Sequence, residues 1–215
     1  MTQGRFVVLE GIDGAGTTTQ TQRLVGALRA RGVKAHATRE PSDGPVGTMI
    51  RQALAGRLVA PPIAGGGAPG WATMALLFAA DRTDHLQCEV LPRLAAGEWV
   101  VSDRYDHSSV AYQGVTSGDA AVTEWIRVIN GRARRPDLTV VVDVSPAVAR
   151  ERRAARAGAR EIYDDDGLQS RLAGFYGRIE AHFTGDRVVH VDGDRDADAV
   201  HRDVMKAVEA LDAEG

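Results

Sequence analysis

A glycine-rich stretch near the start of the chain has the residue types that bind phosphate. GIDGAGTTTQ, residues 11–20, follows the apolar run FVVLE and carries glycines in the spacing G-x-x-x-x-G. A strand, such a loop and a helix in succession present backbone N–H groups and the positive end of a helix dipole to an anion. Thr18 supplies a hydroxyl where such loops hold Mg²⁺. The stretch predicts a nucleotide phosphate site, although a tight strand-to-helix turn could use the same glycines.

Thr17 departs from this pattern, because phosphate-binding loops carry a lysine at its position. Losing one such contact to a transition state costs about 3–4 kcal/mol, roughly 10²–10³ in rate. An arginine brought to a transferring phosphoryl group is worth on the order of 10³–10⁵. The loop therefore belongs either to a kinase that obtains its positive charge elsewhere or to a module that only binds nucleotide.

Two other stretches place chemically useful side chains together. In VVSDRYDHSSVAYQG, residues 100–114, Asp103 and Arg104 stand at the carboxyl end of a predicted strand, where open α/β sheets bind ligands. In LLFAADRTDH, residues 76–85, Phe78 and Arg82 are four residues apart and share a helix face. The first pair suits Mg²⁺ and phosphate, and the second could stack on a base and donate to its carbonyl oxygen. A surface ion pair and ordinary core packing are the simpler alternatives.

An arginine-rich stretch lies at residues 149–167, ARERRAARAGAREIYDDDG. Its glycine and its density of positive charge suit a mobile lid that brings cations onto phosphates. A solvated helix face would show the same charge run. The arginines concerned are Arg150, Arg152, Arg153, Arg156 and Arg160.

The elements that must position these residues alternate along the chain. Five short segments rich in β-branched residues, RFVVLE, VKAHATRE, EWVVSDR, LTVVVDV and RVVHVD, are separated by helical patterns. This alternation predicts a parallel sheet with helices on both faces. Residues 71–96 read as one long helix bent at Pro92, and residues 60–70 as a connection too short to be an interdomain linker. We expect a single domain over residues 1–215.

Composition excludes several classes of function. The 26 Lys and Arg residues against 29 Asp and Glu give a net charge of -3, so no overall basic field indicates a nucleic-acid partner. Cys88 is the only cysteine, which rules out an internal disulfide and fits a reducing compartment. No apolar run approaches the roughly 18 residues of a membrane span, and the N-terminus lacks the shape of a signal peptide. We expect a cytoplasmic protein without a membrane partner.

Taken together, these stretches resemble the thymidylate kinase family. EGIDGAGTTTQ is similar to its phosphate loop, TREP at residues 38–41 to its next motif, and LLFAADR to its base-binding helix. SDRYDHSSVAYQG matches its most specific motif, and RPDLTVVVDVSPAVARERR leads into its lid. The resemblance implies a P-loop NTPase-type α/β fold with a five-stranded parallel sheet, a short arginine-rich lid at about residues 150–165, and a homodimer packed through helices.

The resemblance also implies an acceptor site for dTMP. Phe78 would stack on thymine, Arg82 would donate to the thymine O4, and Tyr112 would crowd the sugar C2′. Cytosine has an amino donor in place of O4, so Arg82 would also explain base choice. Asp13 and Glu40 match acidic residues near the sugar 3′ end and the metal. The full set of dTMP-binding candidates is Asp13, Glu40, Arg51, Phe78, Arg82, Arg104, Ser108, Ser109, Tyr112 and Gln113.

The remaining implied residues serve the phosphates. Arg51 and Arg104 match arginines that hold the 5′-phosphate of the acceptor. The ATP phosphate-binding candidates are Gly11, Gly14, Ala15, Gly16, Thr17, Thr18 and Thr19. The metal candidates are Thr18, Asp103 and Glu161, and the catalytic candidates are Asp13, Arg104, Arg153, Arg156 and Arg160.

The expected reaction is transfer of the γ-phosphoryl group of ATP to dTMP with Mg²⁺, which gives ADP and dTDP for dTTP synthesis. Because the phosphate loop has Gly14 and Ala15 where some family members carry an arginine, the compensating charge would come from the lid. Two alternatives stay open: a catalytically silent module that binds dTMP or another nucleotide, and a kinase of another nucleoside or nucleotide.

Overall fold

Five parallel strands form one sheet, in the order β2-β3-β1-β4-β5. They coincide with the five segments expected from the sequence, so the predicted parallel α/β fold is confirmed. The computed structural model describes residues 4–59, 67, 69–155, 163 and 165–213. The strands are β1 Phe6–Glu10, β2 Ala35–Arg39, β3 Trp99–Asp103, β4 Leu138–Asp143 and β5 Val188–Asp192.

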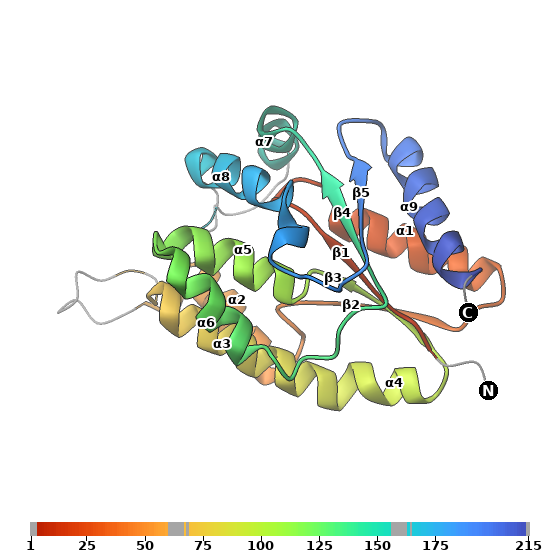
Figure 1. Ribbon diagram of the computed structural model, residues 1–215, viewed down its shortest axis with the longest axis horizontal. Helices are drawn as coiled ribbons and strands as arrows, with labels where there is room; N and C mark the ends of the chain where they lie inside the picture. Colours follow the sequence, from red (N-terminus) through yellow and green to blue (C-terminus); the bar gives the residue numbers. More distant parts are fainter. Residues whose placement is uncertain (1–3, 60–66, 68, 156–162, 164, 214–215) are drawn as a thin grey trace.

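Helices cover both faces of the sheet (Figure 1). On one face, α1 (Thr17–Ala30) packs beside α9 (Ala197–Asp212), which also contacts β4 and β5. On the other, α5 (Asp106–Ser117) packs between α3 (Trp71–His85) and α8 (Asp166–Tyr176). The other described helices are α2 Pro45–Leu54, α4 Leu91–Ala95, α6 Ala120–Ile129, α7 Pro146–Ala154 and the 3₁₀ turn η3 Ile179–Ala181.

The long helix expected over residues 71–96 is continuous but changes its winding. A π-helical segment, η2 (Leu86–Val90), joins α3 to α4. Pro92 lies just beyond this segment and has no N–H to give to the carbonyl of Cys88. The wider π turn accommodates the missing hydrogen bond, as π bulges and prolines commonly do within helices.

The sheet is the centre of the core. Every residue of β1 is fully buried, and its alternate side chains point to opposite faces. Val7 and Leu9 belong to the larger core cluster, with Leu24 of α1 and Val204 of α9. Phe6 belongs to a smaller cluster that also holds side chains of η2 and α4. Burial on both faces explains why the central strands β1 and β4 read as continuous apolar runs.

The register of the sheet brings the predicted chemistry to one edge. Arg39 at the end of β2 pairs with Asp103 at the end of β3, and Asp103 is level with Leu9 of β1. The loops that follow all five strands therefore meet at the carboxyl edge, where parallel sheets bind ligands. Within the described ranges, no helix combines the length and the apolar character that a bilayer crossing requires.

Candidate active site

The phosphate loop connects β1 directly to α1. Gly14 has φ +94°, and a Cβ there would lie 2.5 Å from the backbone oxygen of Ala149 in α7, so only glycine fits. Gly16, with φ +93°, precedes the first helical residue, Thr17. The α1 N-terminus receives no side-chain cap, which leaves its amides available to an anion. The local geometry is therefore the one that the glycine spacing predicts.

The three threonines that open α1 have different environments. Thr17 is buried, whereas Thr18 and Thr19 are exposed. The hydroxyl of Thr18 donates to Oδ2 of Asp103. The other carboxylate oxygen, Oδ1 of Asp103, is buried and has no hydrogen-bond partner among the described residues. The fold thus brings together the two predicted metal-side residues and leaves one oxygen of Asp103 for a ligand.

Arg104 links the phosphate loop to helix α5. Its Nη1 donates to the backbone oxygen of Gly11 at 2.8 Å and to the hydroxyl of Ser108 at 3.0 Å. Its Nη2 lies 2.6 Å from a carboxylate oxygen of Asp13, and its guanidinium stands 5.2 Å from the centre of the Tyr112 ring. The backbone of Arg104 is left-handed, with φ 72°, which is rare outside glycine. The β3–α5 turn thus holds a cation against the phosphate loop.

Glu10, at the end of β1, holds the β3–α5 turn in place. It is fully buried at the end of β1 and accepts hydrogen bonds from the backbone N–H of Tyr105 at 2.8 Å and from the hydroxyls of Ser108 and Tyr176 at 2.7 and 2.8 Å. Burial raises the pKa of its carboxyl, and nearby cations oppose that shift. Sequence reasoning did not select Glu10, because it reads as the last residue of a strand.

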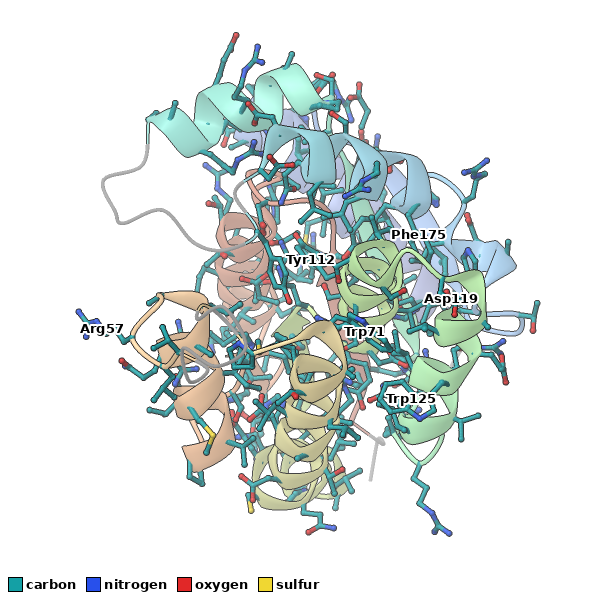
Figure 2. The ribbon with its side chains drawn as sticks, turned by 90° about the vertical axis from the view of Figure 1, so that its left-hand side faces the viewer. Arg57, Trp71, Tyr112, Asp119, Trp125 and Phe175 are labelled. Atoms are coloured by element: carbon teal, nitrogen blue, oxygen red, sulfur yellow. The ribbon has the colours of Figure 1, made fainter. Side chains whose placement is uncertain are left out.

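A cavity of about 160 Å³ opens between this turn and helices α2 and α3. Figure 2 looks onto this side of the molecule, with Tyr112 near the centre. The cavity contains nine of the ten predicted dTMP-binding residues and six that were not predicted to bind dTMP. Its lining is Asp13, Arg39, Glu40, Pro41, Leu54, Phe78, Arg82, Asp103, Arg104, Tyr105, Ser108, Ser109, Tyr112, Gln113 and Tyr163.

Arg82 enters the cavity wall as a buried cation. It is 1% exposed, and its guanidinium lies 2.5 Å from the carboxylate of Glu40. It also donates to Oδ1 of Asn130 and to the hydroxyl of Ser109, and it stands 5.0 Å from the centre of the Tyr105 ring. The Nε of Arg82 has no hydrogen-bond partner within the described part of the chain. Burial lowers the pKa of Arg82, but the charge of Glu40 and its hydrogen bond, together with Asp106 and Tyr105, outweigh burial and raise the pKa.

Two predicted acidic residues have different neighbours. Glu40 faces Arg82, at the end of the cavity where Phe78 lies, whereas Asp13 faces Arg104 and Gln169. Gln169 is fully buried; its amide nitrogen donates to Asp13 Oδ2 at 2.9 Å, and its amide oxygen accepts from the Asp13 backbone N–H at 3.1 Å. Asp13 is thus held between the β3–α5 turn and α8, and Glu40 belongs to the network around Arg82.

Arg51 is the predicted acceptor residue that does not line the cavity. Its guanidinium donates to the backbone oxygens of Pro41 and Ser42 and to the hydroxyl of Thr48. It therefore braces the loop that leads from β2 into α2. The sequence expectation that Arg51 contacts the acceptor phosphate stays a prediction.

The described part of the predicted lid, residues 150–155, contains one of the predicted catalytic arginines. Arg153 in α7 donates to the backbone oxygen of Asp13 at 2.8 Å and pairs with Asp166 at 2.7 Å. Arg152 beside it reaches the backbone oxygens of Ala15 and Gly193. Three predicted site residues lie outside the described residues: Arg156, Arg160 and Glu161.

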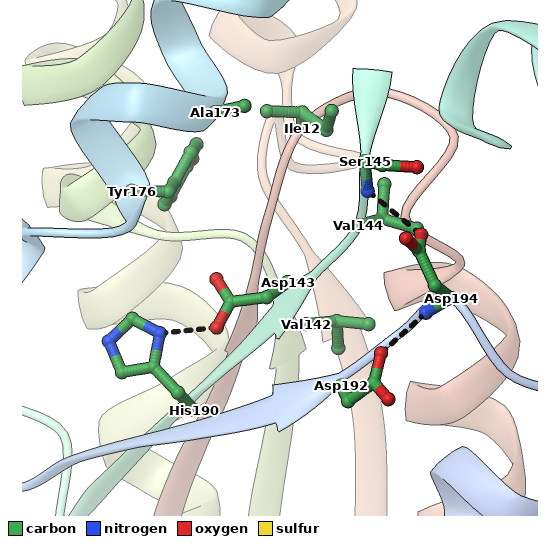
Figure 3. Close-up of a pocket in the computed structure, with 10 residues that line it drawn as sticks. All are labelled: Ile12, Val142, Asp143, Val144, Ser145, Ala173, Tyr176, His190, Asp192 and Asp194. Carbon is green, nitrogen blue, oxygen red and sulfur yellow. Dashed lines mark hydrogen bonds and ion pairs between the residues drawn. The ribbon is translucent and has the colours of Figure 1, made fainter. Parts of the chain in front are cut away.

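A second, more open cavity of about 420 Å³ lies where β4 and β5 end (Figure 3). None of the predicted site residues lines it. Asp143, Asp192 and Asp194 give it acidic walls, and His190 lies 2.7 Å from the Asp143 carboxylate. Carboxylates repel phosphate, so this cavity does not suit a nucleotide.

Comparisons with known proteins agree with the geometry. The thymidylate kinase family model matches residues 9–204. The chain belongs to the thymidylate kinase family. It is 39% identical over 212 residues to a thymidylate kinase of Ruegeria pomeroyi, covering 95% of this chain and 94% of that one. It is 37% identical over 207 residues to one of Alkalilimnicola ehrlichii, covering 93% and 90%, and 40% identical over 157 residues to a probable thymidylate kinase of Pyrobaculum aerophilum, covering 73% of each.

In this member of the thymidylate kinase family, three residues that sequence reasoning missed lie at the cavity or hold its charged side chains. Tyr163 lines the cavity, with its ring centre 5.2 Å from that of Tyr112 and its hydroxyl 3.4 Å from the Gln113 amide nitrogen. Asn130 and Gln169 hold Arg82 and Asp13. A lone tyrosine within an acidic run was the only available signal for Tyr163, and none marked the two amides.

Proposed function

We propose that this protein transfers the γ-phosphoryl group of ATP to dTMP. The observation that carries the proposal is the pairing of Asp13 in the phosphate loop with Arg104 on the cavity wall, at 2.6 Å. This pair connects the donor site to a cavity lined by Phe78, Arg82 and Tyr112. A phosphoryl donor and a pyrimidine acceptor would thus meet within one site.

The acceptor would be oriented by its base and its phosphate. Phe78 would stack on thymine, while the buried charge of Arg82 would favour the O4 of thymine over the amino group of cytosine. The amide oxygen of Gln113 is buried without a partner among the described residues, so it is available to a base N–H. Tyr112 beside Arg104 would exclude a 2′-hydroxyl, and Arg104 would hold the 5′-phosphate.

Phosphoryl transfer needs positioning and charge neutralisation more than covalent help. The attacking oxygen belongs to the dTMP phosphate and is already anionic at neutral pH, so no general base is required. The α1 N-terminus would hold the ATP phosphates through its backbone amides. Asp13, which accepts from both Arg104 and Gln169, would hold the Arg104 guanidinium in place against the acceptor phosphate.

Residues suited to Mg²⁺ are present in the right place. The buried, unpartnered Oδ1 of Asp103 and the hydroxyl of Thr18 are hard oxygen ligands, which Mg²⁺ prefers. The described residues contain no cluster of three or more His, Cys, Asp and Glu side chains that could hold a metal. Nucleotide phosphates and water would complete the coordination, and the ion would supply neutralisation of the charge on the transferred group.

The positive charge missing at Thr17 would come from the lid. Arg153 already contacts the phosphate loop at the backbone oxygen of Asp13. Its guanidinium carries a permanent charge in a side chain that is 12% exposed. Arg156 and Arg160, which lie outside the described residues, are further candidates for the same role.

A coupled assay of ADP release with each nucleoside monophosphate tests the proposal. We expect turnover with dTMP that exceeds turnover with dCMP, dUMP and the ribonucleotides. Silence with every acceptor, together with dTMP binding in calorimetry, would instead identify the silent binding module. Faster turnover with another monophosphate would identify a kinase of that nucleotide.

A further inference from the structure

A buried polar network lies behind the base end of the cavity. Glu40, which holds Arg82, lies 3.3 Å from Nδ1 of His85. The Nε2 of His85 lies 2.7 Å from the hydroxyl of Thr38 on β2. Arg82, Glu40 and His85 are 1, 5 and 2% exposed, so water contributes little to holding them. Their relative positions are set by these contacts.

His85 does not line the cavity, but Glu40 and Arg82 do. The two oxygens of the Glu40 carboxylate are divided between its neighbours: Oε2 faces Arg82 and Oε1 faces His85. Without a donor from His85, the carboxylate could rotate and take the guanidinium with it. The ring of His85 is therefore placed to hold the Glu40 carboxylate, which is one of the partners of Arg82.

The charges around His85 favour a proton donor at this position. Burial lowers the pKa of His85, but the hydrogen bond to Glu40 and the charges of Glu40, Glu89 and Asp81 outweigh it, so the pKa is raised. Glu89 lies 3.7 Å from Nε2 of His85 and in turn binds His36. Glu40 is therefore paired with a donor on each oxygen.

We propose that His85 is a positioning residue that fixes Arg82 through Glu40 and thereby sets the preference of the cavity for thymine over cytosine. This inference rests on the proposed function, because it assigns Arg82 to the base. A guanidinium held by Glu40, Asn130 and Ser109 has little freedom to move aside for the amino group of cytosine. A guanidinium that is held less firmly could turn away from the amino group of cytosine, so the preference for thymine over cytosine would fall.

His85→Phe tests this, because phenylalanine fills the space of the imidazole and donates nothing to Glu40. We expect the KM for dTMP to rise about tenfold, the scale of one lost hydrogen bond to a charged group, while the KM for ATP stays within about twofold. The dTMP to dCMP ratio of kcat/KM should fall about tenfold. An unchanged ratio, or equal changes in both KM values, would overturn the proposal.

Two amide variants separate positioning from packing. The side-chain nitrogen of His85→Asn lies near the place of Nδ1 and can still donate to Glu40, whereas that of His85→Gln lies near Nε2 and reaches toward Thr38. Asn should restore most of the preference for dTMP, and Gln should not. If His85→Phe does not fold, this comparison decides the matter, and equal behaviour of the two amides contradicts the proposal.

His190→Phe is the matched control. His190 is also paired with carboxylates, Asp143 and Glu180, but it lines the other cavity (Figure 3). His190→Phe should leave the KM for dTMP, the KM for ATP and the dTMP to dCMP ratio of kcat/KM unchanged. Calorimetry of dTMP and dCMP binding needs no turnover. If the natural protein transfers no phosphoryl group, the proposed reaction fails, while the ratio of the two affinities still tests His85.

Discussion

The most deeply buried arginine of the described residues, Arg82, lies on the wall of the candidate acceptor cavity. Arg82 is almost inaccessible, and removing a guanidinium from water costs several kcal/mol unless a partner compensates. Glu40 supplies that compensation at 2.5 Å. Such a pair adds little net stability against an apolar equivalent. Its position on the cavity wall agrees with the role in base recognition proposed for Arg82.

Replacing Phe78 tests the stacking assigned to it. Phe78→Ala should raise the KM for dTMP about 5- to 160-fold, because base–aromatic stacking is worth about 1–3 kcal/mol, and should leave the KM for ATP nearly unchanged. Steady-state kinetics with each substrate varied in turn measures both values. Phe175→Ala is a suitable control, because Phe175 stacks on His182 at 4.4 Å and does not line the cavity (Figure 2). Equal effects of the two variants would contradict the assignment.

Thr17 can be tested together with Arg153. Arg153→Ala should lower turnover about 10²-fold or more, the scale of one lost transition-state contact. Thr17→Lys should change turnover little, because a second cation would repel the first. In the Thr17→Lys background, Arg153→Ala should cost much less, since the lysine can take over part of the role.

The double-mutant cycle for these two positions measures that coupling. Single-turnover rates with dTMP and ATP are the appropriate readout, because they report the chemical step. If Thr17→Lys raised the rate about a hundredfold and Arg153→Ala had no effect, the natural protein would lack the positive charge that a lysine supplies at position 17. Arg153 would then not replace that lysine.

At the scale of elements, α5 is the helix on which the cavity depends. It carries Ser108, Ser109, Tyr112 and Gln113, and its N-terminus is fastened by a buried charge cluster. His107 lies 3.3 Å from Asp106 and 3.2 Å from Asp186, and Arg135 pairs with the same two carboxylates. Phe183 packs on the His107 ring at 4.0 Å. The cluster ties α5 to the chain segments before β4 and β5.

The cluster predicts a pH-dependent stability. Burial lowers the pKa of His107, but the carboxylates that face it, Asp106 and Asp186 with Glu10 beyond them, outweigh burial and raise the pKa to about 9. A raised pKa means that the contribution is fully present below the unfolded value of about 6.5 and is lost as pH rises through about 9. We expect His107→Gln to lower the free energy of unfolding by about 3 kcal/mol at pH 6 and by much less at pH 9.5.

Urea denaturation of both proteins at pH 6, 7.5 and 9.5 measures this difference. His201→Gln serves as the control, because His201 is partly exposed on α9 and its pKa is lowered. The free energy of unfolding of His201→Gln should not fall below that of the natural protein at pH 6 and then recover at pH 9.5. A difference between natural protein and His107→Gln that does not vary with pH would show that His107 stabilises the fold by packing alone.

At the scale of the whole molecule, the helices opposite α1 and α9 expose apolar side chains. Trp125 on α6 meets Trp71 on α3 edge to face at 6.0 Å (Figure 2). Leu76, Trp125 and Val128 are 52, 36 and 66% exposed. Exposed apolar area of this kind is common at interaction surfaces. It supports the homodimer packed through helices, which stays a prediction together with the cytoplasmic location.

Sedimentation analysis tests the dimer. The natural protein should sediment as two copies, and Trp125→Glu with Val128→Glu should sediment as one, because a buried unpaired carboxylate opposes association. Lys206→Glu on α9 changes charge at an exposed place on the opposite face and should leave the dimer intact. A natural protein that sediments as one copy would contradict the prediction.

Local patterns were enough to predict the architecture and most of the candidate site. The central strands β1 and β4 are apolar runs rich in valine because both faces of a parallel sheet are covered there, and the glycine loop is short and contiguous. The ends of parallel strands must meet at one edge, so Asp103, Arg104 and the phosphate loop could be placed together before any contact was known. The motif around Phe78 and Arg82 added the base end.

Contacts between distant parts of the chain could not be read in this way. Glu40 meets Arg82 across 42 positions, and Gln169 meets Asp13 across 156. These pairs depend on how separately predictable elements pack, and packing sets burial and side-chain direction. Side-chain direction was equally unpredictable for Tyr163 and Arg51. Tyr163 lines the cavity, whereas Arg51 donates to the loop between β2 and α2. Residue types therefore revealed the chemistry, whereas the tertiary arrangement assigned each charge its partner, because a buried charge must be paired wherever folding places it.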